Sequence, residues 1–166
     1  MKKLYIVRHA KSSWEEPGVS DLHRPLVPKG IRKTGLVIDF LRQQETVIDL
    51  MISSPAVRAF ETARLIAAGL GYPLTEIRVE RKIYEGFYDR ILDLIYATPN
   101  NVGGLMIFGH NPTFTHLANL FLHPGIEAMP TSCVVCISFD TGKWEDIPSC
   151  EPRKEFVVFP RMLKQE

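Results

Sequence analysis

The sequence predicts a three-layer α/β/α sandwich with a mostly parallel central sheet and a C-terminal β-hairpin, formed as one domain over residues 1–166. Two observations lead to this fold class. Short apolar segments alternate with amphipathic segments over most of the chain, a pattern typical of a parallel sheet covered by helices on both faces. The composition, 45% hydrophobic and 23% charged, is ordinary for a globular chain whose length suits one core.

The parallel strands are expected where short apolar runs end in turns or polar residues. They lie at residues 3–7, 47–54, 75–80 and 104–108, and the first and last are the continuous apolar runs "KLYIV" and "GLMIF". A run of this kind is typical of a strand that is buried on both faces.

Four helices are expected between and after these strands. The first begins near Pro28 and the second near Pro55, because proline is favoured in a first helical turn, where its missing N–H is not needed. Apolar residues at helical spacing predict the other two, over residues 88–95 and 114–121. Residues 131–139 and 142–147 are then expected to form a hairpin.

Composition and charge argue against several classes of function. With a net charge of +1, the chain has no general attraction for nucleic acid or for an anionic membrane. No apolar run approaches the ~20 residues of a membrane helix, and the first residues are too short for a signal peptide, so we expect a cytoplasmic protein. The three cysteines do not indicate a disulfide framework, and Cys133 and Cys136 are interpreted as buried structural thiols.

Polar residues end or follow three of the expected strands. Arg8 and His9 end the first strand, Arg58 lies in the helical turn after the second, and His110 follows "GLMIF". A parallel sheet brings the carboxyl ends of its strands to one edge, where ligands bind, so we expect the four side chains to meet there. Each has a structural explanation when taken alone, and only the joint arrangement indicates a site.

A phosphoryl group matches this set of side chains. Arginine offers planar, paired donors for phosphate oxygens, and helix N-termini add oriented N–H groups. A neutral histidine can attack phosphorus and form a phosphoenzyme. The sequence therefore predicts phosphoryl chemistry without a metal or another cofactor.

Three motifs in this order resemble the histidine phosphatase superfamily, also called phosphoglycerate mutase-like. They are Arg8-His9-Ala10, "SSPAVRAFETA" (residues 53–63) and "GHNP" (residues 109–112). The family usually has glycine where this chain has Ala10. The segment "RHAKS" followed by "RPLVPKG" is most similar to the short SixA-type phosphohistidine phosphatases.

The resemblance implies a role for each matching residue. His9 would be the nucleophile, and Arg8 and Arg58 would hold the non-bridging oxygens of the phosphoryl group. His110 would face His9 across the phosphate, and Ser12 would contact the phosphate as in some relatives.

Larger relatives use a glutamate to protonate the leaving oxygen. Glu85 lies near that place in the sequence and is the candidate proton donor, with Glu80 as the second choice. SixA-type enzymes can lack this acid. Arg24, in "HRPL", is left with two interpretations: it borders the mouth of the pocket, or it holds the loop in place.

The resemblance thus predicts a metal-independent phosphatase that forms a phosphohistidine intermediate on His9. The favoured substrate is phosphohistidine in a protein. The alternatives are a small-molecule phosphomonoesterase and a non-catalytic phosphate-binding module. The expected partner is a phosphorylated protein or a small phosphorylated metabolite, with neither nucleic acid nor membrane involved.

Overall fold

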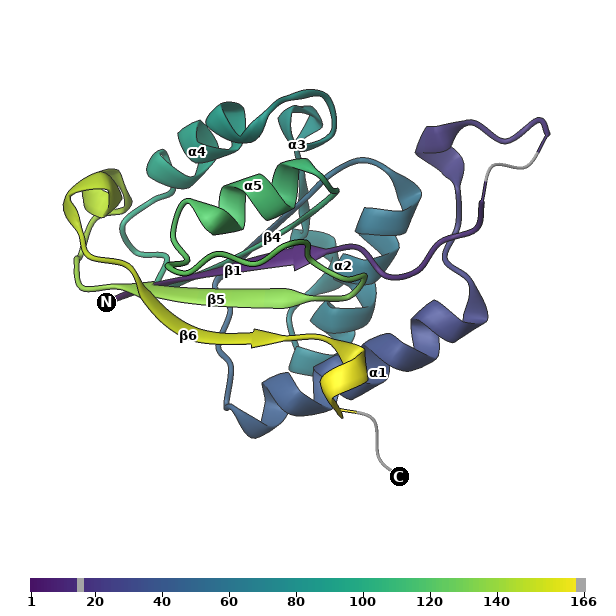
Figure 1. Cartoon of the computed structure of the whole chain (residues 1–166), viewed down its shortest axis with the longest axis horizontal. Helices are drawn as coiled ribbons and strands as arrows, with labels where there is room; N and C mark the ends of the chain where they lie inside the picture. Colours follow the sequence, from purple (N-terminus) through teal and green to yellow (C-terminus); the bar gives the residue numbers. More distant parts are fainter. Residues whose placement is uncertain (15–16, 164–166) are drawn as a thin grey trace.

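A six-stranded sheet forms the centre of the molecule in the computed structural model, which describes residues 1–14 and 17–163 (Figure 1). The strands are β1 (Lys2–Arg8), β2 (Leu50–Ser53), β3 (Arg78–Val79), β4 (Gly104–Gly109), β5 (Val134–Phe139) and β6 (Arg153–Val158). Their order in the sheet is β3-β2-β4-β1-β5-β6. The strands from β3 to β1 run parallel, and β5 and β6 complete the sheet antiparallel to their neighbours.

Helices cover both faces of this sheet, so the three-layer prediction is confirmed (Figure 1). The α-helices are α1 (Pro28–Gln43), α2 (Val57–Leu70), α3 (Arg81–Glu85), α4 (Tyr88–Tyr96) and α5 (Thr113–Asn119). Short 3₁₀ helices lie at Asp21–His23, Leu74–Glu76, Trp144–Ser149 and Pro160–Leu163. Within the described residues, none of the helices is long and apolar enough to span a bilayer.

The strand β1 shows how the sheet separates two cores. Leu4 and Ile6 pack into the core under α4 and α5, whereas Tyr5 and Val7 pack into the core under α1 and α2. Successive side chains of a strand point to opposite faces, so a strand covered on both sides must be apolar throughout. This explains the continuous apolar run in the sequence.

The predicted hairpin is correct in its first strand and wrong in its second. Residues 142–147, expected to be the returning strand, instead contribute to the 3₁₀ helix Trp144–Ser149. The indole of Trp144 is fully buried, and its Nε1 donates to the carbonyl of Val102 at 2.8 Å. Burial of this large side chain holds the segment against the α4 side of the sheet, and the chain returns along β5 only at β6.

Candidate active site

The two histidines meet because β1 and β4 are neighbours that end in register. Arg8 pairs with Gly109, so the residue after each strand is a histidine. The N–H of His9 donates to the carbonyl of Gly109 at 3.1 Å. The ring centroids of His9 and His110 are 5.3 Å apart, with an angle of 49° between the ring planes.

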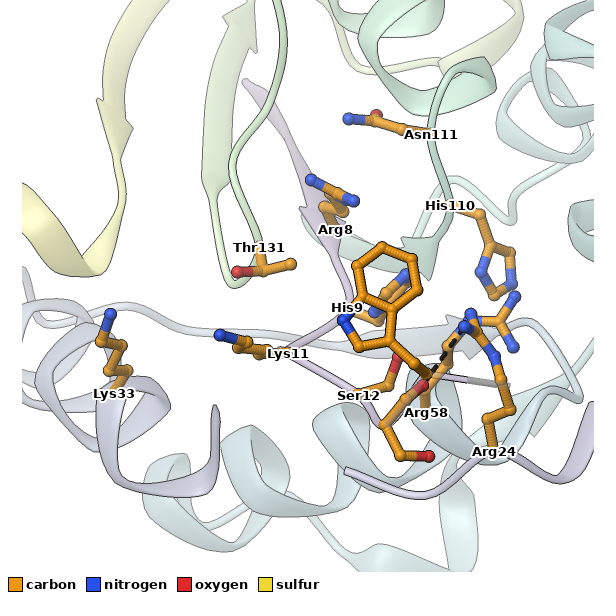
Figure 2. A pocket seen from close by; sticks show the side chains of 12 residues that line it. Arg8, His9, Lys11, Ser12, Arg24, Lys33, Arg58, His110, Asn111 and Thr131 are labelled. Carbon is orange, nitrogen blue, oxygen red and sulfur yellow. Dashed lines mark hydrogen bonds between the residues drawn. The ribbon is translucent and has the colours of Figure 1, made fainter. Parts of the chain in front are cut away.

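Next to these rings lies a cavity of about 470 Å³ (Figure 2). It brings together four of the residues predicted around His9, namely Arg8, Ser12, Arg58 and His110. The other lining residues are Lys11, Ser13, Trp14, Arg24, Lys33, Asn111 and Thr131. The cavity is therefore strongly basic, although the whole chain carries a formal charge of only +1.

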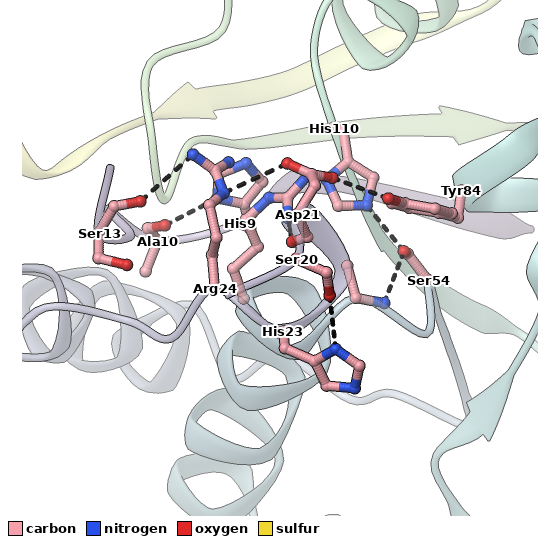
Figure 3. Close-up of polar contacts among 12 residues, drawn as sticks. His9, Ala10, Ser13, Ser20, Asp21, His23, Arg24, Ser54, Tyr84 and His110 are labelled. Atoms are coloured by element: carbon pink, nitrogen blue, oxygen red, sulfur yellow. Dashed lines mark hydrogen bonds and ion pairs between the residues drawn. The ribbon is translucent and has the colours of Figure 1, made fainter. Parts of the chain in front are cut away.

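The environment of His9 gives its ring a defined tautomer. Its Nδ1 lies 2.7 Å from the carbonyl oxygen of Ala10, and a carbonyl can only accept, so Nδ1 carries the proton (Figure 3). Burial, together with the positive charges of Arg58 and Arg8, lowers the pKa of His9 to about 4. At neutral pH the ring is therefore uncharged, with the lone pair on Nε2.

His110 is suited to donate to an anion in the cavity. Burial first, and then the neighbouring His9 and Arg58, lower its pKa to about 3. Its Nε2 lies 2.7 Å from Oγ of Ser54, which already accepts from the N–H of Ala56 at 3.1 Å. The Ser54 hydroxyl can donate to Nε2, and the proton of His110 is then on Nδ1. That atom is buried and has no hydrogen-bond partner among the described residues.

The two arginines enter the site from different elements. Arg8 is the last residue of β1, and its Nη1 donates to the carbonyl of Met129 at 2.9 Å. Arg58 lies in the first turn of α2 and is 6% exposed. The Nε atoms of both are buried without a partner in the part of the chain that the structure describes. Buried donors are normally satisfied, so unpaired N–H groups beside a cavity indicate that a ligand accepts from them.

The loop after β1 is tied to α2 by Thr62. Its hydroxyl accepts the N–H of Ala10 at 2.9 Å and donates to the carbonyl of Arg58 at 2.7 Å. Ala10 is fully buried, so the methyl group that replaces the family's usual glycine is accommodated. This contact links the segment that carries His9 to the helix that carries Arg58.

Residues 4–96 match the family described as Histidine phosphatase superfamily (branch 1). The protein MT1313 of Mycobacterium tuberculosis is 32% identical over 155 residues, which cover 87% of this chain and 94% of that protein. The chain belongs to the histidine phosphatase superfamily. It is therefore a phosphatase.

Two solved structures share the fold of this histidine phosphatase along nearly its whole length. The protein histidine phosphatase SixA complexed with tungstate has a TM-score of 0.81 at 22% identity, covering 98% of this chain and 99% of that one. A mycobacterial glucosyl-3-phosphoglycerate phosphatase has a TM-score of 0.66 at 14% identity, covering 93% and 97%. At these identities the likeness establishes the phosphoglycerate mutase-like fold.

The histidine phosphatase does not bring Glu85 to the cavity. Glu85 is the last residue of the short helix α3, and its carboxylate pairs with Arg81 at 2.7 Å on the surface. The second choice, Glu80, pairs with Arg78 at 2.9 Å. The carboxylate of Glu85 therefore does not line the cavity, and its role as proton donor stays a prediction.

Sequence reasoning missed a polar cluster centred on Asp21 (Figure 3). One carboxylate oxygen lies 3.1 Å from Nη2 of Arg58 and accepts from the hydroxyl of Tyr84 at 2.8 Å. The other lies 3.2 Å from Nε of Arg24. The hydrogen bond from Tyr84 and the charges of Arg58 and Arg24 outweigh partial burial and lower the pKa of Asp21.

Arg24 fulfils both interpretations that the sequence left open. It lines the cavity, and its Nη1 donates to the carbonyl of Ser13 at 3.2 Å, which holds the loop. The only sequence signal for the Asp21 cluster was the spacing of an acidic and a basic residue in "DLHR". That spacing is common on protein surfaces. The described residues contain no group of three or more histidine, cysteine or acidic side chains placed to hold a metal ion.

Proposed function

We propose that this phosphatase hydrolyses phosphohistidine in a phosphorylated protein, through a phosphoryl intermediate on His9. The observation that carries the proposal is the approach of the His9 and His110 rings, with centroids 5.3 Å apart, beside a cavity that Arg8 and Arg58 also line. This set offers a nucleophilic nitrogen, two guanidinium groups and a second imidazole around one space. Those are the groups that phosphoryl transfer to nitrogen needs.

In the first step, the lone pair of His9 Nε2 forms a bond to phosphorus. The bond from phosphorus to the imidazole nitrogen of the substrate breaks, and that nitrogen keeps the electron pair and takes a proton from water. Arg8, Arg58 and the Nδ1–H of His110 stabilise the charge on the equatorial oxygens. The proton of His9 stays on Nδ1, which donates to the carbonyl oxygen of Ala10 throughout.

In the second step, water attacks phosphorus and the bond to Nε2 of His9 breaks. Inorganic phosphate leaves, the surplus proton passes to solvent, and His9 returns to its neutral form. The step involves no oxidation or reduction, and no metal ion takes part in it. The chemistry is a sum of positioning and electrostatic stabilisation.

The position of Glu85 supports a nitrogen leaving group over an alkoxide. An imidazole nitrogen needs less help from an acid than an alkoxide does, and the carboxylate of Glu85 is bound to Arg81 on the surface. The match in length with the SixA protein, which covers 98% of this chain and 99% of that one, agrees with this choice. We also propose that residues 1–166 form one domain, since β5 and β6 complete the sheet that β1 begins.

The proposal is tested by trapping the intermediate and comparing substrates. A phosphohistidine protein and a panel of phosphate monoesters are offered to the wild-type enzyme and to His9→Ala. We expect faster hydrolysis of the phosphohistidine protein, phosphate on His9 in digests kept away from acid, and no turnover by His9→Ala. Preference for a small ester would reverse the assignment of the substrate, and phosphate on another residue would remove His9 as nucleophile.

Glu85→Gln is the matched control for the missing acid. This variant removes a carboxylate that lies on the surface, outside the cavity lining. We expect its rate of phosphohistidine hydrolysis to stay within about twofold of that of the wild type. A large loss would show that Glu85 reaches the substrate during turnover.

A further inference from the structure

Trp14 differs in kind from its neighbours in the cavity wall. It is the only apolar side chain among the described lining residues, which are otherwise lysine, arginine, histidine, serine, asparagine and threonine. It is also 84% exposed, more than any other large hydrophobic side chain that the structure describes. An indole that lines a cavity and also faces water lies at the mouth of that cavity.

The two tryptophans of the chain have opposite surroundings. The indole of Trp144 is fully buried, and its Nε1 donates to the carbonyl of Val102 at 2.8 Å. Trp14 belongs to neither of the two hydrophobic cores, so packing among the described residues does not explain its size. A ligand at the mouth of the cavity would cover the indole and remove apolar surface from water, which is favourable.

The backbone that carries Trp14 is tied to the wall of the cavity. The N–H of Ser13, the preceding residue, donates to the carbonyl of Pro25 at 2.9 Å. The carbonyl of Ser13 accepts from Nη1 of Arg24 at 3.2 Å, and Nε of Arg24 lies 3.2 Å from the carboxylate of Asp21. The position of the indole is therefore set by contacts with residues that themselves border the site.

The leaving group of the reaction points towards this mouth. Phosphoryl transfer proceeds roughly in line, so the leaving nitrogen lies on the far side of phosphorus from Nε2 of His9. His9 is 7% exposed, which places its ring deep in the cavity. The part of the substrate that carries the phosphoryl group therefore extends outward, to the level of the exposed Trp14.

We propose that Trp14 is a specificity-determining residue, whose indole face stacks on the imidazole ring of the substrate's phosphohistidine. This role rests on the proposed function, because it is the leaving imidazole that the indole contacts. Two aromatic rings attract each other when their centroids lie about 4.5–7 Å apart. The imidazole takes a proton as it leaves, and an indole face attracts a cation.

The first arm of the test compares a phosphohistidine peptide with phosphoramidate, whose phosphorus–nitrogen bond carries no ring. Trp14→Ala should lower kcat/KM for the peptide about tenfold, mainly through a higher KM, because the stacking already acts on bound substrate. For phosphoramidate, kcat/KM should stay within about twofold of the wild type. Trp14→Phe keeps an aromatic face and should recover most of the loss, whereas Trp14→Leu is apolar without a ring and should not.

Phe87→Ala is the matched control. The side chain of Phe87 is 78% exposed but lies outside the cavity lining, so it is a large exposed aromatic group without the proposed contact. This variant should keep the wild-type ratio of the two substrates. Because the readout is a ratio of two substrates on one preparation, partial unfolding of a variant does not imitate the effect.

The second arm detects the stacking without turnover. The chain has two tryptophans, so Trp14→Phe leaves only the buried Trp144 to fluoresce. The probe is the same peptide with a phosphonate on a triazole ring in place of phosphohistidine, because its carbon–phosphorus bond is not hydrolysed. Titration with this probe should shift the tryptophan emission of the wild type to shorter wavelength and leave that of Trp14→Phe unchanged. An equal shift in the two proteins would show that the ring does not cover Trp14.

Phenyl phosphate and methyl phosphate distinguish a histidine ring from the ring of a small ester. A Trp14-dependent preference for phenyl phosphate, with none for the peptide over phosphoramidate, would overturn the assignment in favour of an aryl ester.

Two results would overturn the stacking while leaving the proposed function intact. One is an equal loss of kcat/KM for the peptide and for phosphoramidate in Trp14→Ala, and the other is a recovery by Trp14→Leu as complete as that by Trp14→Phe. Failure of the wild-type enzyme to hydrolyse the peptide would contradict the proposed function itself.

Discussion

Asp21 and Arg58 form an ion pair at the edge of the cavity, with 3.1 Å between the carboxylate Oδ2 and Nη2 of the arginine. The carbonyl oxygen of Asp21 also accepts from Nη1 of Arg58 at 2.7 Å. Two contacts from one residue fix the plane of the guanidinium, so that its buried Nε is presented in a single orientation. The orientation of the Arg58 guanidinium thus depends on Asp21, which sequence reasoning did not single out.

Asp21→Asn keeps the size of the side chain and removes its charge. We expect kcat to fall about tenfold with little change in KM, because a less firmly held Arg58 stabilises the transition state less well. Tyr84→Phe removes only the hydroxyl that donates to Asp21 at 2.8 Å, and its loss should be smaller. Steady-state kinetics on one substrate check both variants, and unchanged kcat in Asp21→Asn would show that Arg58 needs no such support.

Arg58→Ala should lower kcat/KM by about 10²–10³-fold, the loss typical of removing one donor that stabilises transition-state charge. Arg58→Lys is the sharper comparison, because it keeps a positive charge and loses the paired donors. It should recover only a small part of the rate. Circular dichroism and thermal melts confirm that each variant is folded, and a folded Arg58→Ala enzyme with near-normal rates would remove Arg58 from the site.

The lowered pKa values of the two histidines predict a dependence of stability on acid. Burial holds the pKa of His9 at about 4 and that of His110 at about 3 in the folded protein, whereas an unfolded chain titrates near 6.5. Between those values the unfolded state binds more protons than the native state, so stability is complete above pH ~6.5 and falls as the pH drops towards ~4. His9→Gln should flatten this fall, measured by urea unfolding from pH 7 to pH 4.

The same values fix the acid limb of the reaction. The pKa of His9 is about 4, so the ring is neutral in the free enzyme between pH 8 and pH 5. Protonation of His9 should therefore not lower kcat/KM in this range. A fall in kcat/KM near pH 6.5 that is seen with every substrate would show that His9 titrates like an exposed histidine.

Chelation tests the expectation that no metal takes part. In the mechanism above, Arg8, Arg58 and His110 supply the positive charge and the donors that a metal ion supplies in other phosphatases. Extensive dialysis against EDTA should therefore leave kcat and KM within about twofold of their starting values. Loss of activity that one divalent ion restores would contradict this account.

Local pattern was enough to place His9, the proposed nucleophile, at the end of a buried strand. The apolar run that ends at Arg8 and His9 determined a buried strand, and the run before "GHNP" determined a second one. Parallel strands end at a common edge, so the meeting of the four candidate residues of three motifs followed from their positions after strands. The resemblance of those motifs then supplied the roles.

Contacts between distant segments decided the rest. The carboxylate of Asp21 meets Arg58 and Tyr84 from 37 and 63 residues away, and no periodicity encodes such pairs. Glu85 is exposed at the end of the short helix α3, where its carboxylate pairs with Arg81. The expected strand 142–147 is replaced in part by the 3₁₀ helix Trp144–Ser149, because the side chain of Trp144 is buried in the core. The sequence by itself determined the parallel strands and the residue types that follow them, since these depend on local periodicity and composition. Only the tertiary structure decided which charges face one another across the cavity, because that depends on packing between segments far apart in the chain.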